Sequence, residues 1–85
     1  MMPLAQLRSL IESAFPGDPV DLTSPMGDDV HFQLVVVSDK FRDKSRVEQH
    51  QMIYRALGDA MAEAVHALSI KTFTPEQWEQ ARGGR

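Results

Sequence analysis

Three histidines, His31, His50 and His66, are the side chains of this 85-residue chain best suited to bind a metal ion. His66 opens the segment 66–73, whose alternating pattern predicts a β-strand. The chain contains no cysteine, so it can form neither a disulfide nor a zinc–thiolate site, and it has no cysteine nucleophile. If His66 is a metal ligand in a site that needs sulfur, a partner must supply that sulfur.

Each histidine also has an interpretation without a metal. A single histidine at a strand edge, such as His66, more often forms a hydrogen bond with the backbone than binds a metal. His31 precedes Phe32 at the start of a second predicted strand. The sequence does not decide whether it is a metal ligand or a polar residue on the exposed face of a hairpin. His50 falls on an apolar helix stripe, where a packing role is favoured over a ligand role.

A small basic cluster, Arg42, Lys44 and Arg46, precedes the predicted central helix, and Lys71 is a candidate addition to it. The cluster is interpreted either as a contact surface for nucleic acid or an acidic partner, or as ordinary solvated charge. We favour solvated charge or a protein partner, because no aromatic platform for bases accompanies it. The net charge of −3, from 9 basic and 12 acidic residues, also weighs against non-specific nucleic-acid binding.

The first half of the chain predicts a helix and two strands. Apolar residues at helical spacing and Pro3 at the first position predict a helix over 3–14, ended by Pro16-Gly17. A weak strand is predicted over 19–24 and the strongest strand over 30–38, paired as a hairpin with an acidic loop. Within the strongest strand, Phe32, Leu34 and Val36 share one face.

The second half predicts a helix or helix pair, a strand and a short helix. Ser45 and Glu48 match a capping box, so a helix begins there. Gly58 could divide that helix in two, which the sequence leaves open. After the strand 66–73, Thr74 and Gln77 form a second capping signal, and the tail 83–85 is expected to fray. The apolar stripe predicted for the central helix comprises Val47, His50, Tyr54, Leu57, Met61 and Ala64 or Val65.

These elements predict a single α+β domain over 1–85, with a three-stranded sheet covered by helices on one face. No signal peptide and no membrane span are expected, so a soluble cytoplasmic protein is the default. An enzyme is not expected, because the chain has no nucleophile arrangement, phosphate loop or pair of convergent carboxylates.

Three stretches of the chain resemble one known family. They are HFQLVVVS at 31–38, FRDKSRVEQHQ at 41–51, and HALSIKT at 66–72 followed by Thr74-Pro75 and Trp78. In this order and spacing they are similar to the BolA family, and the resemblance covers nearly all of the chain from His31 to Trp78. It implies a small α+β domain resembling the class II KH fold, with the order α-β-β-α-α-β-α.

The resemblance also implies a cofactor and partners. BolA-like proteins pair with monothiol glutaredoxins around a bridging [2Fe–2S] cluster, with sulfur from the glutaredoxin cysteine and from glutathione. The family's invariant histidine ligand falls on His66. A second ligand, cysteine or histidine, comes from the loop between the first two strands. The loop 25–30 has neither, and carries Asp28 and Asp29 instead, so His31 at its end is the remaining candidate.

The function predicted from this resemblance is a non-enzymatic iron–sulfur adaptor for cluster trafficking or iron and redox sensing, monomeric or weakly dimeric when alone. The alternative is a DNA-binding transcriptional regulator that uses the KH-like helix pair, as some family members are described. The segment 41–44 stands where a KH domain carries its glycine-rich backbone clamp, but it contains no glycine. That departure counts against RNA binding of the KH type.

Overall fold

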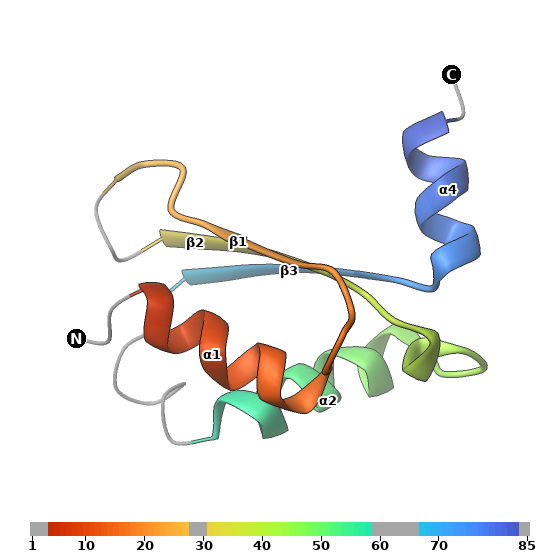
Figure 1. The fold of residues 1–85 in the computed structure, drawn as a ribbon, viewed down its shortest axis with the longest axis horizontal. Coiled ribbons are helices and arrows are strands. Elements are labelled where there is room, and N and C mark those ends of the chain that lie inside the picture. The colour runs from red at the N-terminus through yellow and green to blue at the C-terminus, as the bar shows by residue number, and fades with distance from the viewer. Residues whose placement is uncertain (1–3, 28–30, 59–66, 84–85) are drawn as a thin grey trace.

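A computed structural model describes residues 4–27, 31–58 and 67–83 of the chain, and Figure 1 shows their arrangement. Strands β1, β2 and β3 form one mixed sheet in that order, with β1 antiparallel and β3 parallel to β2. The predicted α+β class and the predicted hairpin are therefore confirmed. The elements are α1 (Leu4–Ala14), β1 (Val20–Thr23), β2 (His31–Val37), the 3-10 helix η1 (Asp39–Phe41), α2 (Arg46–Leu57), β3 (Ala67–Phe73) and α4 (Pro75–Gly83).

The hydrophobic core lies between one face of the sheet and helices α1 and α2, which Figure 1 shows on the same side of the strands. The predicted inward face of β2 is confirmed, since Phe32, Leu34 and Val36 are all at most 2% exposed. A parallel pair such as β2 and β3 needs a crossover connection, and α2 lies in that connection. The core cluster comprises Leu7, Ile11, Phe15, Leu22, Phe32, Leu34, Val36, Phe41, Ile53 and Leu57.

Both predicted capping boxes are present. At α2 the Ser45 hydroxyl accepts from the Glu48 amide, and the Glu48 carboxylate accepts from the Ser45 amide. At α4 the Thr74 hydroxyl and the Gln77 amide oxygen accept from each other's backbone N–H groups in the same way. Helix α2 ends at Gly58, whose φ of 55° lies in the left-handed region that glycine reaches without strain. The predicted second half of the helix pair falls on 59–66, outside the described residues.

The predicted apolar stripe of α2 is wrong for its first turns. Val47 is 67% exposed and Tyr54 is 44% exposed, while Gln49 and Ile53 are buried beside Leu57. The pattern assigned the buried face to apolar residues alone. Gln49 instead enters the interior because its amide finds hydrogen-bond partners there, and this rotates the helix away from the predicted stripe.

Helix α4 stands apart from the other helices. In Figure 1 it rises from the end of β3 toward the side of the sheet opposite α1 and α2. It is held by Trp78, whose ring meets that of Phe73 edge-on at a centroid distance of 5.3 Å. The helix includes Gly83, the first residue of the segment expected to fray, and 84–85 lie outside the described residues.

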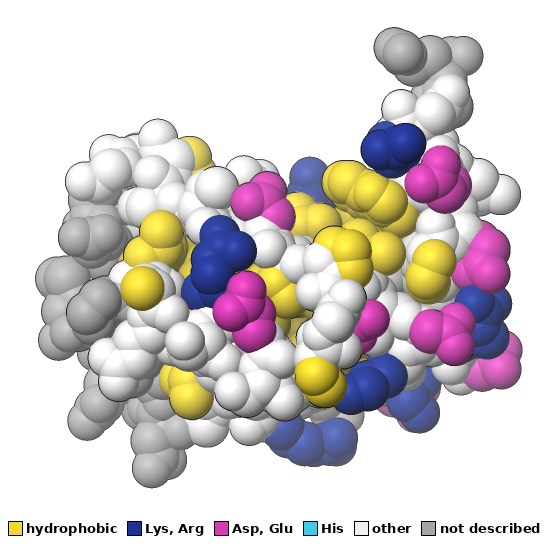
Figure 2. Space-filling model, in the orientation of Figure 1, with side chains coloured by type: hydrophobic (Ala, Val, Ile, Leu, Met, Phe, Trp, Pro, Cys, Tyr) yellow, Lys and Arg dark blue, Asp and Glu magenta, His cyan; other side chains and the backbone are white. Residues whose placement is uncertain are grey.

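The face of the sheet opposite α1 and α2 carries an apolar patch. Figure 2 shows hydrophobic side chains gathered between this face and the base of α4. A shallow pocket there is lined by Pro19, Val20, Asp21, Val35, Val37 and Trp78. Among the described residues, no helix is both long enough and apolar enough to cross a bilayer.

Candidate functional site

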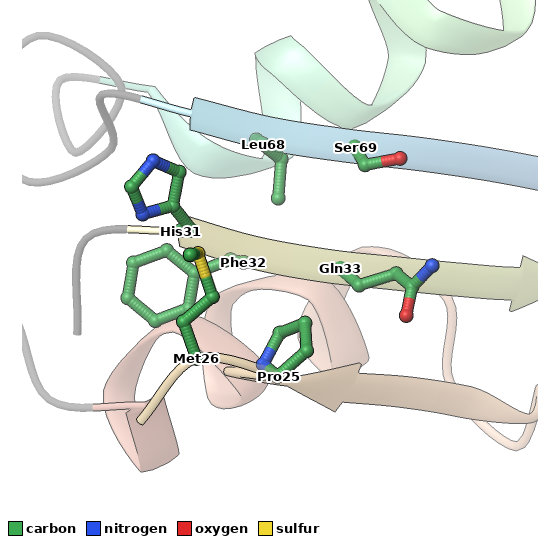
Figure 3. Close-up of a pocket in the computed structure, with 7 residues that line it drawn as sticks. All are labelled: Pro25, Met26, His31, Phe32, Gln33, Leu68 and Ser69. Atoms are coloured by element: carbon green, nitrogen blue, oxygen red, sulfur yellow. The ribbon is translucent and has the colours of Figure 1, made fainter. Parts of the chain in front are cut away.

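His31 is the first residue of β2 and lines a pocket at the end of the sheet. The pocket is open to solvent, has a volume of about 360 Å³, and is bordered by the loop after β1 and by the first residues of β3. In Figure 3 the imidazole lies at the end of the sheet where β2 and β3 begin. The pocket residues are Pro25, Met26, His31, Phe32, Gln33, Leu68 and Ser69.

The loop after β1 brings a methionine to this pocket. Met26 is 68% exposed, and Figure 3 shows its thioether beside the rings of His31 and Phe32. The Ser24 hydroxyl donates to the backbone carbonyl of His31 at 3.2 Å and so ties the loop to the start of β2. Met26 therefore does not fill a gap in the core, whereas Met52 packs against the core.

The strand register fixes what lies next to His31. In the parallel pairing of β2 with β3, His31 stands opposite Ala67. Ala67 is the residue that follows His66 in the sequence. His66 itself, and the loop residues Asp28 and Asp29, lie outside the described part of the chain.

The described part of the chain contains no self-contained metal site. Within residues 4–27, 31–58 and 67–83, no three side chains of histidine, aspartate or glutamate are grouped so as to hold a metal ion. In the same part of the chain, every buried polar side-chain atom has a hydrogen-bond partner. An exposed imidazole at an open sheet end can contribute one ligand to a metal whose other ligands come from outside.

The predicted basic cluster is only partly brought together. Lys44 and Arg46 line one hollow, and Arg46 and Lys71 line the adjoining one, so these three cations follow a single groove between α2 and β3. Arg42 points elsewhere. Its guanidinium donates to Asp39 and, at 2.8 and 2.9 Å, to both carboxylate oxygens of Glu76.

The pairing of Arg42 changes the acid–base behaviour of the groups around it. The hydrogen bond to Asp39, and then that to Glu76, raise the pKa of Arg42 above its usual range. The pKa of Glu76 is lowered, first by a hydrogen bond with its own backbone amide and then by Arg42. Arg42 is therefore committed to joining η1 to α4, across a separation of 34 residues in sequence.

Gln49 connects the elements around the groove. Its amide nitrogen donates to the carbonyls of Phe41 and Lys44 at 3.1 and 3.0 Å, and its amide oxygen accepts from the Thr72 hydroxyl. The side chain is only 8% exposed. Sequence reasoning missed this residue because a glutamine inside an amphipathic pattern reads as solvent-facing. His50, next to it, is half-buried and lines the groove, in agreement with the packing role predicted for it.

These features define a small α+β domain with a mixed three-stranded sheet and surface sites at one sheet end and one sheet edge. A model of the family described as BolA-like protein matches residues 13–77. The chain is 32% identical over 83 residues to BolA-like protein 1 of Mus musculus, covering 89% of this chain and 61% of that protein. The chain belongs to the BolA-like family.

A bacterial relative carries a more specific name. The DNA-binding transcriptional regulator BolA of Escherichia coli (strain K12) is 40% identical over 55 residues, which cover 65% of this chain and 52% of that protein. The chain thus spans between half and two thirds of the length of these curated relatives. Both are named as a BolA-like protein or a regulator, and neither is named as an enzyme.

The solved structures agree with the fold. The solution structure of the BolA1 protein from Mus musculus superposes with a TM-score of 0.80 at 31% identity, covering 96% of this chain and 73% of that one. The predicted family and the predicted fold class are therefore both confirmed.

Proposed function

We propose that this protein is a non-enzymatic iron–sulfur adaptor. In this proposal it pairs with a monothiol glutaredoxin, and the pair shares a [2Fe–2S] cluster whose sulfur ligands come from the glutaredoxin cysteine and glutathione. His66 is the ligand from this chain, and His31 is the second. The absence of cysteine from the chain supports this assignment of imidazole ligands to the chain and thiolate ligands to the partner, because the chain has no thiolate to contribute.

The pairing of His31 with Ala67 is the observation that carries the proposal. Parallel strands begin at the same end of a sheet, so the register puts His31 opposite the residue directly after His66. In the proposal, two imidazoles that are 35 positions apart in sequence serve this one end of the sheet.

The chain's own residues have distinct tasks at this site. Neutral imidazole is a good ligand for iron, and two histidines in place of two thiolates raise the potential of the one-electron centre that such a cluster supplies. Phe32 and Leu68 form an apolar border to the pocket and so limit water access from the core side. Met26 contributes an exposed apolar side chain to the surface that a partner would cover.

Co-expression with a monothiol glutaredoxin in the presence of glutathione tests the proposal. We expect a coloured heterodimer whose absorption and circular dichroism spectra report the cluster. His66→Ala should abolish the heterodimer cluster spectrum or convert it to that of the glutaredoxin alone. His31→Ala should alter the spectrum and speed cluster loss.

An exposed polar residue on α2 provides the control. Gln51→Ala lies outside the pocket and should leave the spectrum unchanged. A His66→Ala protein with the wild-type spectrum would refute the assignment of the cluster to this end of the sheet. If only His31→Ala has no effect, the second ligand is a different group.

A DNA-binding regulator is the second candidate function. It is favoured by the name of the Escherichia coli relative and by the three cations along the groove between α2 and β3. Binding to a defined duplex should then fall steeply with salt and be lost on changing Lys44 and Arg46. A flat titration at low salt would remove this candidate.

A further inference from the structure

The outer edge of β3 has no strand paired with it within the described residues. There β3 is the last strand of the sheet, and its strand partner is β2. The Phe73 carbonyl accepts from the Ser38 amide at 2.9 Å and therefore faces β2. Because backbone groups alternate in direction along a strand, the N–H and C=O groups of Ile70 and Thr72 face the open side. Within the described residues, no side chain forms a hydrogen bond with the outward backbone groups of β3.

A groove runs along this same edge. It consists of two adjoining hollows of about 430 and 380 Å³, which share Arg46, Thr72 and Phe73. The first turns of α2 form the opposite wall, and Figure 3 shows α2 beside the outer side of β3. The hydrogen bond between Gln49 and Thr72 holds that wall in place. The groove follows β3 from Ser69 to Phe73, a length of about 17 Å that matches an extended segment of about five residues.

The described residues that line the groove carry charge of one sign. Lys44, Arg46 and Lys71 are among them, and no described aspartate or glutamate is. None of the three forms a salt bridge with a carboxylate in the described part of the chain, where the ion pairs involve Arg8, Arg42 and Arg82. These cations are therefore available to a ligand, in a chain whose net charge is −3.

We propose that this groove binds an extended acidic segment of a partner protein by strand addition to β3. The backbone of the segment would pair with Ile70 and Thr72, and its acidic side chains would meet Lys44, Arg46 and Lys71. Main-chain pairing supplies affinity, and the cations select acidic sequences.

A nucleic acid fits the groove less well than a polypeptide. It has no backbone N–H and C=O ladder to match the open edge of β3. The adjoining turn at 41–44 offers no glycine for close approach to phosphate, and Asp43 occupies its left-handed position with φ of 62° and adds a negative charge. This inference goes beyond the cluster-binding proposal and requires neither a cluster nor a glutaredoxin.

Fluorescence polarisation with a synthetic peptide tests strand addition. The probe is a capped octapeptide that alternates glutamate with valine, titrated against the whole protein. Two N-methylated twins carry the methyl groups on the odd-numbered or on the even-numbered amides, and both keep the charge of the parent. Because only every second amide of an added strand faces β3, we expect the parent to bind with saturation, one twin to bind about as well, and the other twin to bind at least tenfold more weakly. Equal binding of the parent and both N-methylated twins would overturn the proposal.

Charge reversal in the groove provides the second arm. The double variant Arg46→Glu with Lys71→Glu should weaken parent binding by roughly tenfold or more. Arg55→Glu, an exposed position in the last turn of α2 outside the groove, is the matched control and should change binding by less than about twofold. If Arg55→Glu weakens binding as much as the groove variant does, the attraction is non-specific and the proposal fails.

Amide NMR supplies the remaining readouts. Saturation with peptide should slow hydrogen exchange at Ile70 and Thr72, and the spectra confirm that each variant is folded. If the Arg46→Glu with Lys71→Glu double variant unfolds, the neutral double variant Arg46→Gln with Lys71→Gln replaces it. A single-stranded or duplex oligonucleotide serves as the competitor. If it displaces the peptide and binds more tightly than the peptide does, the groove is a nucleic-acid site and the proposal is overturned.

Discussion

The outward backbone groups at the two edges of the sheet, β1 and β3, differ in their hydrogen bonding. At the edge of β1, the Arg8 guanidinium reaches from α1 and donates to the outward carbonyls of Val20 and Leu22 at 2.9 and 3.4 Å. At the edge of β3, cations line the groove beside the strand, and within the described residues no hydrogen bond is formed with its outward backbone groups. An unprotected edge is a site for pairing with another chain, so proteins usually block it. The difference supports the proposal that β3, rather than β1, is the edge at which a selected partner pairs.

Loss of the Gln49 side chain should have the largest effect on this comparison. Gln49→Leu removes three hydrogen bonds and leaves the Phe41 and Lys44 carbonyls without them, so we expect a loss of about 3 kcal/mol in the free energy of unfolding. Acidic-peptide binding at β3 should weaken as well, because the wall formed by α2 is no longer tied to the strand. Urea denaturation measures the first effect, and Gln51→Leu is the exposed control, expected within about 0.5 kcal/mol of wild type.

Removal of Arg8 tests the closed edge. Arg8→Ala takes two hydrogen bonds from the β1 carbonyls, which should cost about 1–2 kcal/mol of unfolding free energy and increase self-association. Urea denaturation and sedimentation velocity check the two effects. Glu12→Ala removes only the 3.9 Å ion pair with Arg8 and should change little. If Arg8→Ala is as stable and monomeric as wild type, the guanidinium does not protect the edge.

The N-terminal cap of α2, the helix that lines the groove beside β3, should make a smaller contribution to stability. Ser45→Ala removes the hydroxyl that accepts from the Glu48 amide, and we expect a loss of about 1 kcal/mol by thermal or urea unfolding. Ser9→Ala, at an exposed position within α1, is the control and should be close to neutral. A neutral Ser45→Ala would mean that water replaces the cap without cost.

Low pH should destabilise the N-terminal end of α2. The pKa of Glu48 is lowered from its ordinary value of 4.5, first by the hydrogen bond with the Ser45 amide. A depressed carboxyl pKa stabilises the fold above the unfolded-state value, and this contribution is lost as the pH falls through the folded-state pKa. Stability should therefore decline below about pH 4.5, and Glu48→Gln should show a shallower decline in urea midpoints. Parallel pH profiles for the two proteins would contradict this.

The smallest expected effect concerns Arg42. Glu76→Gln weakens the pairing that holds Arg42 away from the groove, so the affinity for the acidic peptide should rise about twofold. Glu79→Gln, one turn along α4, is the matched control and should leave affinity unchanged. An unchanged affinity in Glu76→Gln would show that Asp39 alone is sufficient to hold Arg42.

Local signals were enough to predict much of the fold. The capping boxes at Ser45 and Thr74 and the alternation in 31–37 each depend on neighbouring residues, and the structure bears them out. The stripe of α2 could not be predicted in the same way. The burial of Gln49 depends on Thr72 in β3 and on the carbonyls before the helix, and no helical pattern contains those partners.

The sequence by itself determined the class, through alternation and caps, and it determined the family and the candidate ligands through its resemblance to the BolA family, because all of these are properties of the linear chain. Only the tertiary structure decided which residues meet. The parallel register sets His31 opposite the residue after His66, and Arg42 joins Glu76 while Lys44, Arg46 and Lys71 share a groove. The edges of the sheet differ for the same reason. Whether a strand edge is blocked depends on a side chain from another element, and packing brings Arg8 to β1 while no described side chain is brought into hydrogen bonding with the outward edge of β3.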